Sequence, residues 1–219
     1  MVSRVNRPLP AFRSALVTAA TLAVLAPLVG ACGSSTSGSD GTSGSTDGGS
    51  STEPKIERPT ASCPVEITTY PDISAVHVPE GTVITYDSNP PCIGNHYPVW
   101  ANFTEFDKPL DEGYLVHSLE HGAVALLYKC ATPNDPACAA NLAELRKIRE
   151  AMPTDARCDS VTRVRVIVAP FPRLDRPVAA AAWGKTYKAD CVDVATLTKF
   201  ANDNYAKSPE DICASGRAF

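Results

Sequence analysis

The chain has 219 residues, of which 44% are hydrophobic and 20% are charged, and its formal net charge at pH 7 is −4. It contains no cluster of Lys and Arg that could displace the counterions of nucleic-acid phosphates, so we expect no nucleic-acid partner. Beyond residue 31 no apolar run approaches the roughly twenty residues of a transmembrane helix, which excludes a membrane-spanning domain there.

Residues 1–31 predict a lipoprotein signal peptide. Three arginines precede roughly fifteen small or apolar residues, which is the pattern of a secretory signal. The run ends in Leu-Val-Gly-Ala-Cys at residues 28–32, which is similar to a bacterial lipobox. We therefore expect Cys32 to carry the lipid anchor, palmitate included, and to become the mature N-terminus; the alternative is cleavage near Ala31 with Cys32 incidental. Removal of residues 1–31 leaves 17 Lys and Arg against 24 Asp and Glu, a net charge of −7.

Residues 32–61 predict a flexible tether. They are rich in Ser, Gly, Thr and Asp and cannot bury enough apolar surface to offset their chain entropy. A random coil of roughly thirty residues reaches about 30 Å, which is enough to clear lipid headgroups. Residues 62–219 then form one globular domain held near a membrane through the anchor. We expect it in the bacterial cell envelope, on the periplasmic or outer-membrane face, and the sequence identifies no protein partner.

Seven cysteines follow Cys32, an odd number in a compartment that favours disulfides. Cys130 and Cys138 enclose a loop rich in Pro, Asn and Asp that can fold its ends together, so we pair them. For the other candidates we favour the pairs Cys158 with Cys191 and Cys63 with Cys213, although connectivity cannot be read from one sequence. That assignment leaves Cys92 as the candidate free thiol, and the alternative for Cys92 is a buried, inert cysteine.

Hydrophobic patterning predicts the elements of the domain. In chain order they are a short strand at Val83–Thr85, a buried strand at 123–128, an amphipathic helix from Ala139 to Met152, a buried strand within 163–171, a third strand from Val178 and a helix capped by Asp193. This order implies an α/β or α+β fold, a single two-layer domain with a mixed sheet, stabilised by disulfides. A thioredoxin-like arrangement fits the order β-α-β-β-α, but the chain has no Cys-x-x-Cys motif.

The stretch Val-His-Ser-Leu-Glu-His-Gly at residues 116–122 carries two of the four histidines of the chain. If residues 117–121 form a helical turn, the i,i+4 spacing places His117 and His121 on one face, where both can bind the same ion. His96, on a proline-rich turn, can supply a third nitrogen. Three neutral imidazoles leave a coordination position open and suit zinc or copper better than magnesium or calcium. Glu120 and Cys92 are possible additional ligands.

Other interpretations of these residues stay open. The motif is not the H-E-x-x-H signature of zinc proteases, because Glu120 directly precedes the second histidine rather than following the first. Cys92 and His96 could contribute to a cupredoxin-like thiolate site, for which Met152 is the one thioether within the domain. The motif histidines could instead brace the turn at Gly122. His77 has no motif partner and is expected to be a surface or strand residue.

Three segments carry a resemblance to a known family: Tyr-Asp-Ser-Asn-Pro-Pro-Cys-Ile-Gly-Asn-His-Tyr-Pro-Val-Trp-Ala at 86–101, Glu-Gly-Tyr-Leu-Val-His-Ser-Leu-Glu-His-Gly-Ala-Val-Ala-Leu-Leu-Tyr at 112–128 and Ala-Ala-Trp-Gly at 181–184. Over residues 78–200 the chain resembles the domain-of-unknown-function family 3105, bacterial proteins that are secreted, membrane-tethered or lipid-anchored. The resemblance implies a compartment and a shared histidine-bearing site, and it brings no activity with it. Cys92 departs from the small hydroxylated residue that members often have after the proline pair.

The sequence supports three functions in descending order. The first is a lipid-anchored envelope protein that binds copper or zinc through His96, His117 and His121. The second is a non-catalytic binding or scaffolding module whose histidines are structural. The third is a His/Cys-based enzyme with Glu120 orienting a histidine base and Cys92 as nucleophile. Against catalysis, the chain shows no glycine-rich phosphate loop and no G-x-S-x-G motif.

Overall fold

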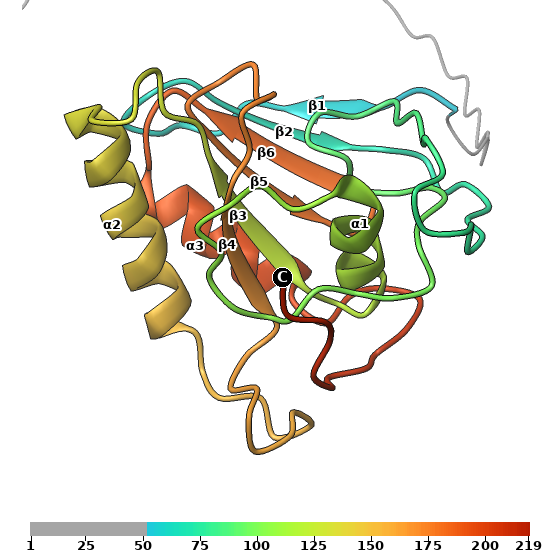
Figure 1. Cartoon of the computed structure of the whole chain (residues 1–219). Helices are drawn as coiled ribbons and strands as arrows, with labels where there is room; N and C mark the ends of the chain where they lie inside the picture. Colours follow the sequence, from blue (N-terminus) through green and yellow to red (C-terminus); the bar gives the residue numbers. More distant parts are fainter. Residues whose placement is uncertain (1–51) are drawn as a thin grey trace, which may run out of the picture. The chain divides into compact units, whose positions relative to one another are not determined.

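One mixed sheet organises the part of the chain that the structure describes. The computed structural model describes residues 52–219, and six strands form a sheet in the order β1-β2-β6-β5-β3-β4 (Figure 1). The strands are β1 (Lys55–Glu57), β2 (Val65–Thr69), β3 (Val124–Tyr128), β4 (Val166–Pro170), β5 (Val178–Ala182) and β6 (Lys185–Ala189). The helices are α1 (Glu112–Glu120), α2 (Pro136–Ala151) and α3 (Val194–Asn204). The expected signal peptide and Cys32 lie outside the described residues.

The pairing of the strands is antiparallel except between β3 and β4. α2 connects this parallel pair, because parallel strands need a crossover rather than a tight turn. The order β3-α2-β4 followed by β5-β6-α3 adds one strand to the β-α-β-β-α order of the thioredoxin-like expectation. The mixed sheet with three helices among the described residues is an α+β fold, which confirms the predicted class.

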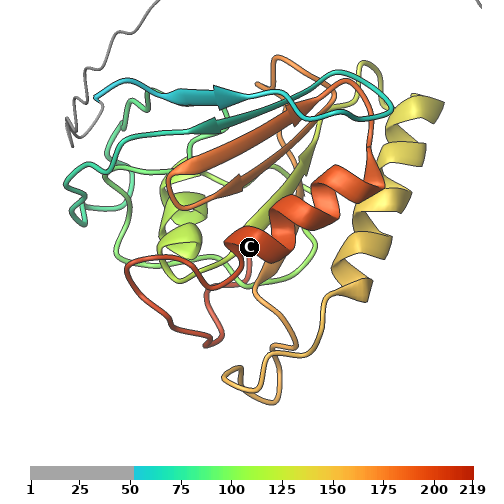
Figure 2. The same cartoon turned by 180° about the vertical axis from the view of Figure 1, so that it is seen from behind.

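Both faces of the sheet are covered. On one face Leu126 of β3 packs in a core with Leu145 of α2 and Leu197 of α3. On the other face Leu127 packs with Leu119 of α1. Figure 2 shows α3 in front of the sheet, on the side opposite α1. Because β3 is buried on both faces, it forms from a continuous apolar run instead of an alternating one.

Aspartates begin the two longer helices. Asp193 caps α3 as predicted, and its side chain accepts from the backbone N–H of Thr196. Asp135 caps α2 with Pro136 in the first turn, a position that needs no N–H donor. α2 therefore begins three residues before the predicted Ala139, inside the loop that the Cys130–Cys138 pair closes.

One prediction of local structure is wrong. The strand at Val83–Thr85 does not form, since Val83 is 93% exposed and lacks the packing that would stabilise a strand. The strand predicted from Val178 forms as β5 and continues into β6 through a hairpin that turns at Gly184, with a φ of 70°. Within residues 32–61, Ile56 of β1 pairs with Thr68 of β2.

The structure confirms the Cys130–Cys138 disulfide. The other two predicted pairings, Cys158 with Cys191 and Cys63 with Cys213, are wrong. The two further disulfides are Cys63–Cys191 and Cys158–Cys213. β2 and β6 pair with Val65 opposite Ala189, so the cysteines two residues beyond that pair meet across the sheet. Cys92 is free and buried.

These disulfides indicate an oxidising environment. Among residues 52–219 no helix combines the length and the apolar character needed to cross a membrane.

Candidate metal centre

The end of α1 presents two histidines to each other. Asp111 begins the helix by accepting from the N–H of Gly113, and Gly122 ends it with a φ of 84°. His117 and His121 are 3% and 2% exposed, and their Nε2 atoms lie 3.1 Å apart. The i,i+4 spacing thus places both rings on one face, as the motif predicts.

The turn that precedes α1 adds His96, which is 1% exposed. Its Nδ1 lies 2.8 Å from the carbonyl oxygen of Gly94, and a carbonyl can only accept, so Nδ1 carries the ring proton. The opposite atom, Nε2, lies 2.8 Å from Oε2 of Glu120 and has no hydrogen-bond partner among the described residues. Nε2 is therefore the ring nitrogen that faces the Glu120 carboxylate.

His117 is oriented in the same way. Its Nδ1 lies 2.6 Å from the carbonyl oxygen of Tyr97 and must donate to it, which leaves Nε2 unprotonated in the neutral ring. Burial lowers the pKa of His117 to about 4, so the ring is neutral at pH 7. Histidines that bind metals are held by this kind of hydrogen bond from the second ring nitrogen.

His77 joins these residues although its sequence context predicts only a surface or strand position. A backbone bridge between His77 and His96 brings it there, and the Val78 N–H donates to the carbonyl of His96 at 2.8 Å. Its ring centroid lies 4.9 Å from that of His96 and 4.8 Å from that of His117. Half of its side chain remains exposed. No spacing pattern signals this contact, because an isolated bridge between two irregular segments creates it.

Two groups of possible ligands result, and they share His117. In each group one ligand atom from every residue lies within 4.8 Å of the others. We call His77, His96, His117 and Glu120 the inner group, and His117, His121 and Glu210 the outer group. The predicted set of His96, His117 and His121 is thus divided, with Glu120 beside His96 and with His121 on the other side of His117.

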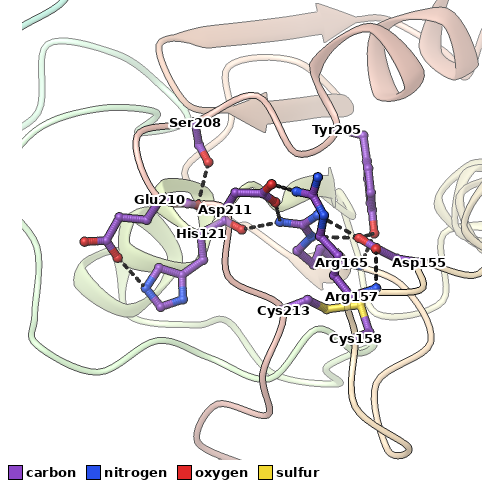
Figure 3. Close-up of polar contacts among 10 residues, drawn as sticks. All are labelled: His121, Asp155, Arg157, Cys158, Arg165, Tyr205, Ser208, Glu210, Asp211 and Cys213. Carbon is purple, nitrogen blue, oxygen red and sulfur yellow. Dashed lines mark hydrogen bonds and ion pairs between the residues drawn. A yellow bond between two sulfur atoms is a disulfide. The ribbon is translucent and has the colours of Figure 1, made fainter.

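Glu210, which the sequence does not single out, comes from the C-terminal segment. Its backbone N–H donates to the carbonyl of Glu120 at 3.1 Å, and its Oε2 lies 3.0 Å from Nε2 of His121 (Figure 3). Burial lowers the pKa of His121, an effect that the Glu210 carboxylate opposes.

Cys92 and Met152 lie elsewhere. Cys92 belongs to neither group, its thiol donates to no histidine, and burial raises its pKa to about 12. Met152 packs in the core on the α2 face of the sheet, whereas Cys92 packs on the α1 face. Cys92 therefore lies outside both groups and is separated from Met152 by the sheet, so this geometry gives the cupredoxin-like interpretation no support. A third cluster, Asp155 with Cys158 and Cys213, offers no thiolates because its cysteines form a disulfide.

The rings of two tryptophans lie beside the histidines. The Trp100 ring centroid lies 4.3 Å from that of His121 and 5.4 Å from that of His117. Trp183 lies 6.1 Å from His96. These are the two tryptophans of the chain, so its tryptophan fluorescence reports on this site.

In each group one pair of ligand atoms is close enough to share a small ion. Two ligand atoms that each lie about 2.05 Å from a tetrahedral zinc ion are about 3.3 Å apart. The observed separations are 2.8 Å from His96 to Glu120 and 3.1 Å from His117 to His121. Imidazoles with one carboxylate form a donor set for zinc, copper or another first-row transition ion, whereas magnesium and calcium prefer oxygen donors alone.

The fold and the site define a disulfide-bonded α+β domain with a buried cluster of histidine and glutamate residues. Residues 77–215, more than half of the chain, match the family described as "Protein of unknown function (DUF3105)". The chain belongs to this family, in agreement with the resemblance in its motifs. No curated protein and no solved structure matches it.

Proposed function

We propose that this chain is a lipid-anchored protein of the bacterial envelope that binds one zinc or copper ion at the inner group. The anchor is Cys32, which the lipobox-like sequence points to, and the tether leaves the domain free to meet its partners near the membrane.

The contact between His96 and Glu120 carries the proposal. Nε2 of His96 and the carboxylate oxygen of Glu120 face each other at 2.8 Å inside the protein. The contact is attractive when Nε2 carries a second ring proton and donates to the carboxylate, or when a metal ion binds both atoms. A second proton on His96 would stabilise only the contact between His96 and Glu120. A metal ion would in addition bind the unprotonated nitrogen of His117 and the nearby ring of His77.

The ligand types limit the ion. Three imidazoles and a carboxylate match the preferences of Zn²⁺ and Cu²⁺. Neither the buried Cys92 nor the core residue Met152 supplies a soft sulfur ligand that would favour Cu⁺.

Metal content tests this function. The full chain, purified in mild detergent and dialysed against ZnSO₄ or CuSO₄ and then against buffer, should hold close to one ion by mass spectrometry. The double variant His77→Ala/Glu120→Gln, which keeps the buried rings of His96 and His117, should bind the ion at least a hundredfold more weakly. Glu144→Gln is the matched control and should bind like the parent, because Glu144 lies on α2, where its carboxylate pairs with Lys147.

Two results would contradict the metal function. One is a folded parent that holds no ion after either treatment, and the other is equal binding by the parent and the double variant. In the first case the histidines would be structural residues of a binding module.

The anchor has a separate test. Cys32→Ser should move the protein from the membrane fraction to the soluble fraction, because the lipid is attached through that thiol. Retention of the variant in the membrane fraction would mean that another feature holds the chain there.

A further inference from the structure

The inner and outer groups compete for one nitrogen. His117 belongs to both, and its Nδ1 is occupied by the hydrogen bond to the carbonyl of Tyr97. Only Nε2 is left, and its single lone pair binds one ion at a time. The groups are therefore alternative positions for one ion and not a two-metal site.

The outer group is built into the fold. The segment Tyr205–Phe219, which we call the C-terminal strap, is attached to the end of α1 by the N–H of Ala206, which donates to the carbonyl of Gly122 at 2.9 Å. The backbone hydrogen bond from Glu210 to Glu120 adds a second attachment. Glu210 is thus held beside His121 by the main chain as well as by its own carboxylate.

Arg165 fixes the strap and the helix end together. This residue is 1% exposed, and its Nη1 donates to Asp211 at 2.7 Å and to the carbonyl of His121 at 3.1 Å (Figure 3). Asp155 accepts from the same guanidinium at 2.7 Å. These hydrogen bonds hold Asp211 next to the end of α1. Because Glu210 directly precedes Asp211 in the chain, they also hold Glu210 near His121.

The outer group should bind an ion more weakly than the inner group. To bind an ion through Nε2, the neutral His121 ring must carry its proton on Nδ1, an atom that is buried without a hydrogen-bond partner in the described part of the chain. The inner position has no such penalty, because Nδ1 of His96 and of His117 both donate to carbonyls. The side chain of Glu210 is also 43% exposed, against 13% for Glu120, so solvent competes for the ion there.

We propose that the outer group is a transit position, through which the ion bound at the inner group enters and leaves the protein. This inference rests on the proposed metal function. The ion stays on Nε2 of His117 while His121 and Glu210 replace His77, His96 and Glu120, so it never has to lose all its protein ligands at once. Stepwise exchange of this kind suits a protein that passes its ion to a partner.

The kinetics of zinc exchange test the proposal. Full-length parent, Glu210→Gln and the control Glu144→Gln are loaded with Zn²⁺ and mixed with an excess of a chromogenic chelator in a stopped-flow instrument. Tryptophan fluorescence follows uptake of free Zn²⁺ in the reverse experiment. We expect Glu210→Gln to slow release and uptake at least tenfold each, so that affinity changes far less than either rate, and Glu144→Gln to match the parent.

Each other outcome overturns the proposal in a recognisable way. Unchanged rates in Glu210→Gln would mean that the ion leaves by another path, such as past the half-exposed His77. Two zinc ions per chain would mean that the groups do not compete. A loss of affinity in Glu210→Gln with an unchanged rate of uptake would make Glu210 a permanent ligand. A parent that binds neither zinc nor copper would refute the metal function itself, which none of the other three outcomes does.

Discussion

At the scale of single residues, Gly122 sets how closely the C-terminal strap approaches the candidate metal centre. Its φ of 84° lies in the left-handed region, and an added Cβ would lie 2.8 Å from Cα of Ala206 and 3.0 Å from Nη1 of Arg165. A glycine is required there both by the backbone conformation that ends α1 and by the neighbour that packs on it.

Gly122→Ala should lower the free energy of unfolding by about 2 kcal/mol or more, since the left-handed conformation costs a non-glycine residue about 1–2 kcal/mol and the overlap adds to that. Urea unfolding of the metal-free protein measures the loss. Gly81→Ala is the matched control, because Gly81 has a similar φ of 83° with no atom within 4 Å of the added Cβ. Equal losses in the two variants would show that the close approach at Gly122 does not matter.

At the scale of secondary structure, the N-terminus of α3 joins the helix to the segment before β2. The carboxylate of Asp193 accepts from the N–H of Thr196 and, at 2.8 Å each, from the N–H and the hydroxyl of Ser62. The hydrogen bonds with Ser62 and Thr196 lower the pKa of Asp193 below its usual range. The same residue thus caps a helix and holds the chain next to the Cys63–Cys191 disulfide.

Asp193→Ala should lower the free energy of unfolding at pH 7 by about 1 kcal/mol, the usual effect of losing an N-cap. A carboxyl whose folded pKa is depressed stabilises the protein above its unfolded pKa, and this contribution disappears as the pH falls. The difference between parent and variant should therefore narrow below about pH 4. Asp193→Asn, which still accepts hydrogen bonds, should lose less at pH 7. Urea unfolding at several pH values would contradict this account if the difference stayed constant on acidification.

At the scale of the whole molecule, the disulfides close loops of very different length. Cys63 and Cys191 are 128 residues apart in the sequence, whereas Cys130 and Cys138 are 8 apart. Cross-linking distant positions removes more conformations from the unfolded chain than cross-linking neighbours does. The long loop contains all four residues of the inner group, so its disulfide constrains the part of the chain that forms this group.

Replacing Cys63 and Cys191 by alanine should lower the free energy of unfolding by about 5 kcal/mol, and replacing Cys130 and Cys138 by about 2.5 kcal/mol, on the chain-entropy estimate. Thermal and denaturant unfolding of the two double variants checks the order. A larger loss from the short loop would show that local packing at the start of α2, and not loop closure, determines the effect.

Much of the local structure could be predicted from the sequence because it depends on residues a few positions apart. The Asp193 cap of α3, the buried strand before the cysteine loop and the Cys130–Cys138 disulfide are of this kind. The pairing of His117 with His121 is another, since one turn of helix decides it.

Only the tertiary structure determined the contacts between segments that lie far apart along the chain. The motif alone points to metal chemistry, but an isolated bridge brings His77 to His96, and the C-terminal strap brings Glu210 to His121. The pairing of β2 with β6 likewise selects Cys191 as the partner of Cys63. Hydrophobic periodicity describes which face of an element is buried, not which distant segment packs on it. The sequence therefore determined the kind of candidate ligand, and the fold determined which residues come together.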